Sequence, residues 1–207
     1  MERIVFGDES SKTVLIQPVD EHDLSLMDSE IPLIRDLSGS DFALWAFKVD
    51  NWNEDLSPWR APAVFGDEAF GEGAEKTLEK VLENCTDTSR KYYIGGYSLA
   101  GLFALWSACR SDLFEGVAAA SPSVWFPGFT ESLRDSGVRS TGVYLSLGDR
   151  EAKTKNPVMA TVADRIRETH ELLLARGVKT VLEWNAGNHF KEPDLRMAKG
   201  FAWLLKS

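Results

Sequence analysis

Cysteine and positive charge are both scarce in this sequence. The 207 residues include only two cysteines, Cys85 and Cys109, which are too few for a disulfide framework or a thiolate metal site. Asp and Glu outnumber Lys and Arg by 32 to 23, which gives a net charge of −9. This balance disfavours binding to nucleic acid phosphates or to an anionic membrane face. We expect no nucleic-acid partner, no membrane partner and a reducing, cytoplasmic location.

Long apolar runs and cofactor-binding motifs are absent as well. The longest run of apolar and small residues spans 99–109, well short of the about 18 residues that cross a membrane. The sequence begins Met-Glu-Arg-Ile-Val-Phe, without the basic start and apolar stretch of an export signal. Gly71 and Gly73 lack the third glycine of a dinucleotide-binding loop, and no P-loop or zinc-helix pattern occurs. We expect a soluble protein that needs no cofactor and no metal.

Short apolar segments alternate along the chain with segments of helical periodicity. This alternation predicts one α/β domain over residues 1–207, with a mostly parallel central sheet flanked by helices. At this length there is little room for a separate lid domain, and none is expected. The sheet is expected to be antiparallel at its N-terminal edge. Residues 21–30 are read as an acidic stretch and 37–40 as a turn. The predicted strands are 12–19, 41–49, 91–97, 116–120, 142–147 and 179–184, and the predicted helices are 74–84, 98–110, about 156–176 and 193–205.

A serine lies where one predicted strand runs directly into a buried helix. The segment Gly-Gly-Tyr-Ser-Leu-Ala-Gly occupies 95–101. A nucleophile on such a sharp turn needs small residues two positions before and after it, and these are Gly96 and Ala100. The pattern predicts a nucleophile elbow with Ser98 as the nucleophile. The Leu99 amide lies at the N-terminus of the helix, where it can donate to a developing oxyanion.

Three histidines are available to take the proton of the serine. His22 lies in the acidic stretch, and His170 falls on the apolar stripe of a helix, where a core or boundary role is the better interpretation. His189 lies in the loop after the last predicted strand, where a side chain can reach over the edge of the sheet. We therefore expect His189 to be the base.

The base needs a carboxylate that orients it and stabilises the imidazolium. The turn Gly-Asp-Arg-Glu at 148–151 follows the fifth predicted strand and offers two acids. Glu151 is preferred because the turn needs its glycine first and the acid at its far side, and Asp149 is the alternative. The chain order Ser98, Glu151, His189 is the order found in α/β-hydrolases.

Four segments extend this pattern over about residues 41–207. They read Gly-Gly-Tyr-Ser-Leu-Ala-Gly at 95–101, Ala-Ser-Pro-Ser-Val-Trp-Phe-Pro at 120–127, Gly-Asp-Arg-Glu-Ala-Lys-Thr-Lys-Asn at 148–156 and Gly-Asn-His-Phe at 187–190. Together they resemble the esterase D branch of the α/β-hydrolases, which holds small esterases, enterochelin-esterase-like siderophore hydrolases and mycolyltransferases. The resemblance implies an α/β-hydrolase fold with Ser98 as nucleophile, His189 as base and an acid in the turn at 148–151.

Further residues are expected around the reacting bond. The second oxyanion donor is expected in the loop after the strand at 41–49, at Asn51 or Trp52, because that strand is expected beside the strand that carries the nucleophile. Lys153 and Lys155 are read as a solvated face. The residues expected to bind substrate or line its pocket are Tyr97, Trp125, Trp52, Trp59 and Phe126.

These features predict a serine esterase that cleaves small or medium-sized soluble esters through an acyl-enzyme. The resemblance adds siderophore-lactone-like esters to the candidate substrates. One alternative is an acyltransferase, in which an alcohol or sugar takes the place of water. A second alternative is a ligand-binding protein that keeps the fold without turnover, but the intact set of Ser98, Glu151 and His189 argues against it.

Overall fold

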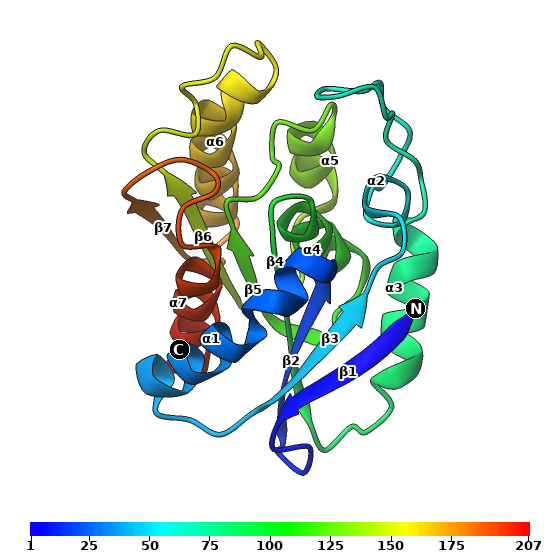
Figure 1. Ribbon diagram of the computed structural model, residues 1–207, viewed down its shortest axis with the longest axis vertical. Coiled ribbons are helices and arrows are strands. Elements are labelled where there is room, and N and C mark those ends of the chain that lie inside the picture. Colours follow the sequence, from blue (N-terminus) through cyan, green and yellow to red (C-terminus); the bar gives the residue numbers. More distant parts are fainter.

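The computed structural model describes residues 1–207 and shows a seven-stranded sheet with helices on both faces (Figure 1). The strand order is β1-β3-β2-β4-β5-β6-β7. Strand β1 runs antiparallel to β3 at one edge, and all other neighbours are parallel. The strands are β1 (Glu2–Gly7), β2 (Thr13–Val19), β3 (Ala43–Lys48), β4 (Lys91–Tyr97), β5 (Phe114–Ala120), β6 (Gly142–Gly148) and β7 (Lys179–Asn185).

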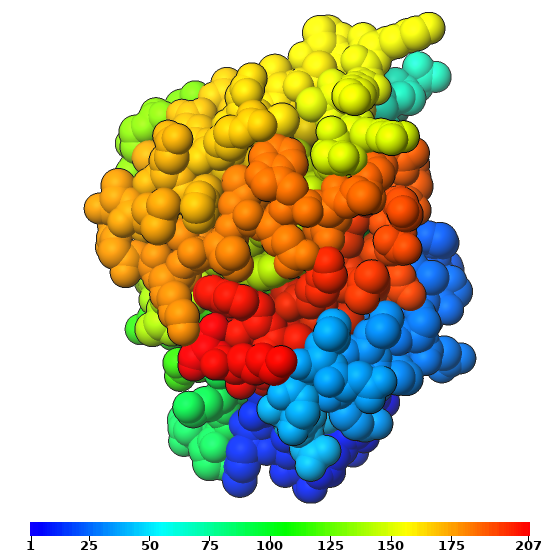
Figure 2. Space-filling view, turned by 90° about the vertical axis from the view of Figure 1, so that its left-hand side faces the viewer, coloured from blue at the N-terminus to red at the C-terminus, as the bar shows by residue number.

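Two layers of helices enclose this sheet. Helices α1 and α7 cover one face and pack against each other, and Figure 2 shows α7 in red between α1 in blue and the orange segment of α6 and β7. The remaining longer helices cover the other face. No helix is long and apolar enough to cross a membrane. The helices are α1 (Glu21–Ser38), α2 (Trp52–Asp55), α3 (Ala74–Asn84), α4 (Leu99–Arg110), α5 (Phe129–Ser136), α6 (Val162–Ala175) and α7 (Pro193–Leu205), with a short 3₁₀ turn at Met159–Thr161.

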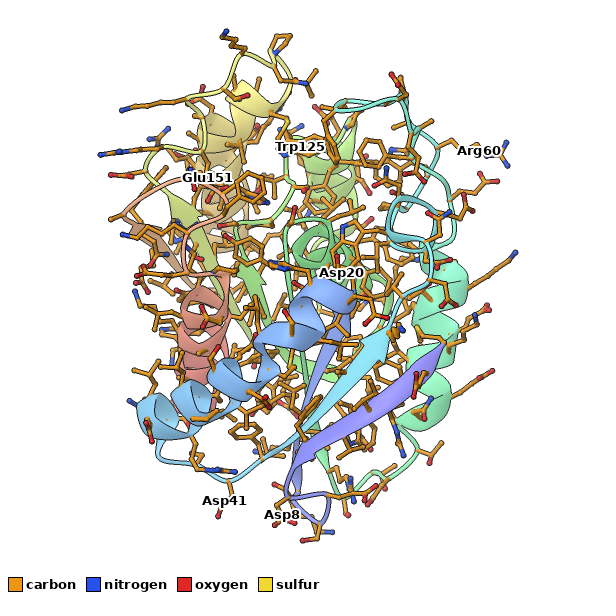
Figure 3. The ribbon with its side chains drawn as sticks, in the orientation of Figure 1. Asp8, Asp20, Asp41, Arg60, Trp125 and Glu151 are labelled. Carbon is orange, nitrogen blue, oxygen red and sulfur yellow. The ribbon has the colours of Figure 1, made fainter.

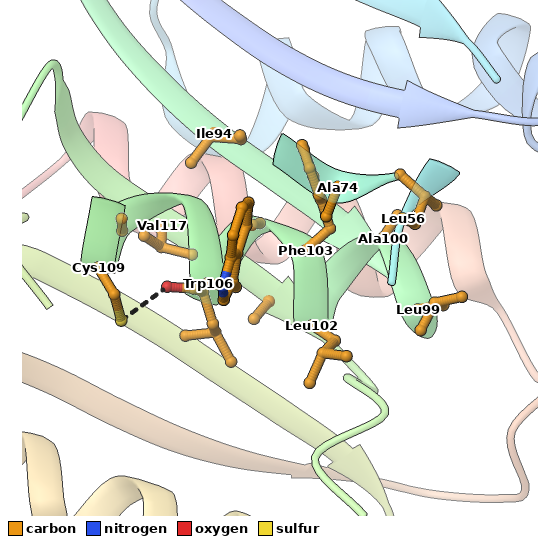
Figure 4. Packing of buried hydrophobic residues seen from close by; sticks show 14 of the residues in the cluster. Leu56, Ala74, Ile94, Leu99, Ala100, Leu102, Phe103, Trp106, Cys109 and Val117 are labelled. Carbon is orange, nitrogen blue, oxygen red and sulfur yellow. Dashed lines mark hydrogen bonds between the residues drawn. The ribbon is translucent and has the colours of Figure 1, made fainter. Parts of the chain in front are cut away.

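Helix α4 is buried on all sides. Every residue from Leu99 to Cys109 is buried, and Figure 4 shows side chains such as Phe103 and Trp106 packing in several directions around the helix. A helix that is apolar around its whole circumference is stable only inside a core. Because close-packed interiors deform little, α4 gives a rigid support to the turn that precedes it.

The predicted α/β class, with a mostly parallel sheet flanked by helices, is confirmed. All six predicted strands form, but the strand β1 and the helices α2 and α5 were not predicted. Residues 21–30 were described only as an acidic stretch, and the helix α1 that they begin was not predicted. Asp20 and Asp23 form a capping box at its start, and acidic residues in a first turn stabilise the helix dipole. The helix predicted from residue 156 begins instead with the 3₁₀ turn, and α6 starts at Val162.

Helix α1 buries one carboxyl group against the sheet. Glu30 is 2% exposed, and its Oε2 accepts a hydrogen bond from Nε2 of Gln17 on β2 at 3.4 Å. The second carboxyl oxygen of Glu30 and the side-chain amide oxygen of Gln17 have no hydrogen-bond partner in the protein. Burial raises the pKa of Glu30 well above its usual value of 4.5. Folding therefore disfavours the ionised form of Glu30.

This burial predicts that Glu30→Gln stabilises the protein at alkaline pH. The unfolded chain ionises Glu30 above pH 4.5 while the folded chain resists, so the wild type loses stability as the pH rises from 4.5 toward the raised pKa. The variant lacks this loss. We expect urea unfolding to show an advantage of about 1–3 kcal/mol for Glu30→Gln at pH 8 and a smaller one at pH 5. The exposed Glu79→Gln serves as the control. An advantage that does not grow with pH would contradict the expected titration.

Candidate active site

Ser98 lies in a strained turn between β4 and α4. Its backbone has φ 56° and ψ −120°, a conformation that non-glycine residues rarely adopt. The turn is tight enough that a Cβ on Gly96 would lie 2.4 Å from the carbonyl carbon of Ala100. The expected need for small residues on both sides of the serine is therefore met in the geometry.

Ser98, His189 and Glu151 form one hydrogen-bonded chain. Nε2 of His189 lies 3.0 Å from Oγ of Ser98, and Nδ1 of His189 lies 2.7 Å from Oε2 of Glu151. Both distances are within hydrogen-bonding range. The Glu151 side chain is 4% exposed and that of His189 is 27% exposed, so solvent reaches the histidine but hardly the acid.

Glu151 is held as an anion despite its burial. Burial alone would raise its pKa, but the hydrogen bond and charge of His189 and the hydrogen bonds from Ser121 and the Gly148 amide outweigh it and lower the pKa of Glu151. Oγ of Ser121 and the Gly148 amide each donate to Oε1 at 2.7 Å. The carboxylate is therefore fixed through one oxygen and faces the histidine with the other.

Asp149, the alternative acid, has a different partner. Its Oδ1 accepts the amide of Gly187 at 2.7 Å, which ties the turn after β6 to the loop that carries His189. Gly148 is required in this turn because a Cβ there would lie 2.5 Å from the Gly187 carbonyl oxygen. The structure thus pairs Glu151, and not Asp149, with the histidine.

Two pockets open on the pair formed by Ser98 and His189. The first, of about 330 Å³, has an apolar lining apart from the hydrogen-bonded chain and Ser121. The second, of about 200 Å³, reaches the start of α1 and contains carboxylates. Figure 3 shows Trp125 and Glu151 of the first pocket in the upper part of the molecule and Asp20 of the second near its middle, with Asp8 and Asp41 at the lower end. The residues that line only the first are Phe65, Ser121, Trp125, Glu151, Met159 and Val162, those that line only the second are Asp20, His22, Asp23, Trp52, Tyr97 and Pro193, and Phe190 lines both.

The aromatic residues expected around the substrate divide into two groups. Trp125 lines the first pocket, and Tyr97 and Trp52 line the second. Trp59 and Phe126 line neither and pack against each other, with ring centroids 5.8 Å apart. The expectation that these two form the pocket wall is therefore wrong.

Several pocket residues carried no sequence signal that we recognised. His22 was set aside as part of the acidic stretch, but it lines the second pocket. Phe190 is 85% exposed and lines both pockets. The sequence signal that could have identified it as a pocket residue is its position directly after His189. Lys153 and Lys155 are exposed and line neither of the two pockets.

The strand beside the nucleophile's strand is β2, not β3. The expectation of an oxyanion donor after β3 assumed that β3 is the neighbour of β4, and the strand order contradicts this assumption. Asn51 is also engaged, since its amide donates to the Asp55 carboxylate at 3.0 Å. Trp52 lies in the second pocket with Ser98, at the first position of α2. The segment that follows β2 begins at Asp20, which lines the same pocket.

Arg196 of α7 is a further member of the site that the sequence did not indicate. Its side chain is 1% exposed, and Nη1 donates to Oε1 of Glu151 at 2.8 Å. The helix that carries it was predicted correctly, but Arg196 interrupts an otherwise apolar face. A charged residue at a buried helical position was the signal that could have identified it.

No three or more His, Cys, Asp or Glu side chains are gathered closely enough to hold a metal ion. Cys85 and Cys109 are both buried, and burial raises the pKa of each thiol to about 12. A thiol in this state is a poor nucleophile at neutral pH. The residues that can react at this site are therefore Ser98 and His189.

Comparisons with known proteins agree on the fold. No protein-family model and no curated protein matches the chain. Among solved structures, the siderophore hydrolase EstA from Aspergillus nidulans is similar with a TM-score of 0.70 and 18% identity, covering 96% of this chain and 85% of the other. An IroE-like serine hydrolase from Shewanella oneidensis gives a TM-score of 0.78 and 15% identity, covering 99% and 75%.

The enterobactin esterase FES from Shigella flexneri is also similar, with a TM-score of 0.66 and 13% identity. The match covers 98% of this chain but only 54% of the FES chain. At these identities the likeness is one of fold, and it extends over nearly the whole chain. Together with the sheet order and the strained serine turn, it shows that this chain has the α/β-hydrolase fold.

Proposed function

We propose that this protein is a serine esterase in which Ser98, His189 and Glu151 form a catalytic triad. The observation that carries the proposal is the hydrogen-bonded chain from Ser98 through His189 to Glu151, at 3.0 Å and 2.7 Å. Its placement on a strained turn at the mouth of two pockets supports the proposal, because a nucleophile must reach its substrate. The printed names of the similar structures, which are esterases and serine hydrolases, support it as well.

The proposed reaction has two halves. His189 takes the proton of Ser98 as Oγ of the serine attacks the ester carbonyl. The same histidine then gives this proton to the departing alkoxide. Glu151 stabilises the imidazolium that exists between these transfers. A water molecule then repeats the sequence on the acyl-enzyme, which releases the acid and restores the serine hydroxyl.

The oxyanion of the tetrahedral intermediate needs two donors. The first is the amide of Leu99, which opens α4 directly after the nucleophile. Amides in the first turn of a helix lack intrahelical partners, so the starts of α1 and α2 are both sources of a second donor. We place it at the amide of Glu21 or His22, because β2 is the neighbour of β4 and the Asp20 amide is engaged with the Asp23 carboxylate, with Trp52 as the other candidate in the same pocket.

The two pockets suggest the kind of ester. The first has the size and apolar lining to hold an aromatic or short aliphatic group, with Phe65, Trp125 and Phe190 as its rings. The second carries Asp20 and Asp23 and no basic side chain except His22. We propose small or medium-sized esters that are neutral or cationic, and the siderophore esters named for similar structures are candidates within that range.

A fluorophosphonate tests the nucleophile. We expect intact mass measurement to show one adduct on the wild type and none on Ser98→Ala, because only an activated serine attacks phosphorus. Turnover of p-nitrophenyl butyrate should fall at least about a thousand-fold in both Ser98→Ala and His189→Ala. A folded wild type that neither reacts with the fluorophosphonate nor turns over substrate would favour a ligand-binding protein without catalytic activity.

Added alcohols distinguish hydrolysis from acyl transfer. Diversion of the acyl group into new esters of these alcohols would reveal an acyltransferase.

Two matched substitutions, each of a carboxylate by its amide, identify the acid of the triad. Glu151→Gln should lower kcat/KM by about a hundred-fold or more, since the amide no longer stabilises an imidazolium. Asp149→Asn should change it less than about ten-fold, because asparagine can still accept the Gly187 amide. Both variants remove one carboxylate from the same turn, so steady-state kinetics on p-nitrophenyl butyrate compares them directly. The reverse order of effects would assign the acid role to Asp149.

The second pocket predicts a preference for positive charge. Burial raises the pKa of Asp23 to about 6, so Asp23 is ionised at pH 8. We expect kcat/KM for butyrylcholine to exceed that for its neutral isostere 3,3-dimethylbutyl butyrate by about two- to ten-fold at pH 8 and low salt. The ratio should fall below pH 6 and in Asp23→Asn. A ratio of one or less at pH 8 would exclude a role for these carboxylates in recognition.

A further inference from the structure

Arg196 is the most deeply buried charged side chain near Ser98. It projects from α7 with 1% exposure, and it lines neither of the two pockets. A buried guanidinium is costly unless its donors are satisfied. Here Nη1 donates to Oε1 of Glu151 at 2.8 Å, to Oγ of Ser121 at 3.0 Å and to the hydroxyl of Tyr97 at 3.1 Å.

The other arm of the guanidinium holds the loop that carries His189. Nη2 donates to the carbonyl oxygen of Asn188 at 2.9 Å and, at 3.5 Å, to that of Ala186. Tyr97, which accepts from Arg196, donates in turn to the carbonyl oxygen of His189 at 2.7 Å. One side chain thus connects the strand before Ser98, the turn of Glu151 and the loop of His189.

We propose that Arg196 is a positioning residue that holds Glu151 and the His189 loop in register and offsets part of the negative charge of Glu151. This inference rests on the proposed function, since it assigns Arg196 a role in the same reaction. Arg196 binds one carboxylate oxygen of Glu151 while His189 binds the other. The two donors therefore share one negative charge, and Arg196 lines neither of the two pockets.

Removal of Arg196 should shift the pH dependence of the reaction in a direction that can be measured. Without the cation, the full charge of Glu151 stabilises the imidazolium form of His189, so the histidine stays protonated to a higher pH. Because only neutral imidazole accepts the serine proton, the acidic limb of the pH profile moves upward. The other ionisable groups around the pair include Asp149 and Arg150 in the same turn, Lys191 beside Gly187 in the His189 loop, Tyr97 on β4, and Asp20, His22 and Asp23 across the second pocket. None of them is changed in the comparison.

The test compares Arg196→Met, Arg196→Lys and the surface control Arg110→Met. Arg110 lies at the far end of α4 from Ser98 and pairs with the exposed Glu75. Fluorophosphonate labelling first gives the concentration of reactive serine in each preparation, and circular dichroism reports folding. The pH dependence of kcat and kcat/KM with p-nitrophenyl butyrate is then measured per labelled site. If the wild type is not labelled, it is the proposed function that fails, and not the assignment of Arg196 alone.

For Arg196→Met we expect kcat to fall about ten-fold or more with KM within about three-fold, because Arg196 contacts no bound substrate. The acidic limb of kcat/KM should move up by about half a pH unit or more. Arg196→Lys keeps the positive charge, but one ammonium group cannot reach both Glu151 and the carbonyl oxygens of the His189 loop. Its kcat should therefore fall, while the acidic limb of its pH profile stays near that of the wild type. Arg110→Met should match the wild type in both.

A purely structural role gives a different result. Loss of folded protein scales the rate equally at every pH, and the rate per labelled site stays near that of the wild type. That outcome, or an unmoved acidic limb in folded Arg196→Met, overturns the proposal. If Arg196→Met does not fold, Arg196→Gln and Arg196→Lys carry the same comparison of a neutral with a charged side chain, and equal pH profiles of the two would overturn it.

Discussion

The backbone strain at Ser98 is the constraint on which the site depends. A residue with φ 56° is unfavourable by about 1–3 kcal/mol, and it persists only where its surroundings fix it. Here β4 lies inside the sheet and α4 is buried throughout, so neither flanking element can move to relax the turn. Gly96 and Ala100 allow the close approach that the turn requires. The result is a hydroxyl that projects from the carboxyl end of the sheet toward the loop of His189.

A second constraint is the burial of two opposite charges beneath that hydroxyl. Glu151 and Arg196 are 4% and 1% exposed, and they face each other at 2.8 Å. An isolated charge at either position would be strongly unfavourable, but the pair and its neutral donors satisfy one another. The arrangement also explains why the acid lies two residues after Asp149, which is engaged with the backbone of the opposite loop. The orientation of the His189 ring is thus fixed by Glu151 and Arg196, two buried groups that solvent hardly reaches.

Local sequence patterns predicted the parts of this protein that depend on local chemistry. The elbow at 95–101, the turn at 148–151 and the helix at Pro193–Leu205 were found where proline, glycine and apolar spacing placed them. The order of the strands was not predictable in this way, because pairing β4 with β2 is a long-range contact. The oxyanion donor was therefore expected in the loop after β3, because β3 was wrongly assumed to lie beside β4. Helix α1 was missed because its acidic first turn resembles a loop in composition, although Met27, Ile31 and Ile34 form a buried stripe.

Phe190 is the one residue besides Ser98 and His189 that lines both pockets. It stands 85% exposed, with its ring edge-to-face to that of His189 at a centroid distance of 5.5 Å, so it is not part of the hydrophobic core. A change at this position therefore alters the space in both pockets at once, with little cost to the fold. If each pocket holds one half of an ester, as the proposed function has it, selectivity for the two halves is linked in evolution at residue 190, and a lineage that adapts one half there also changes the other. Independent adaptation requires positions such as Met159 or Trp52, which each belong to one pocket alone.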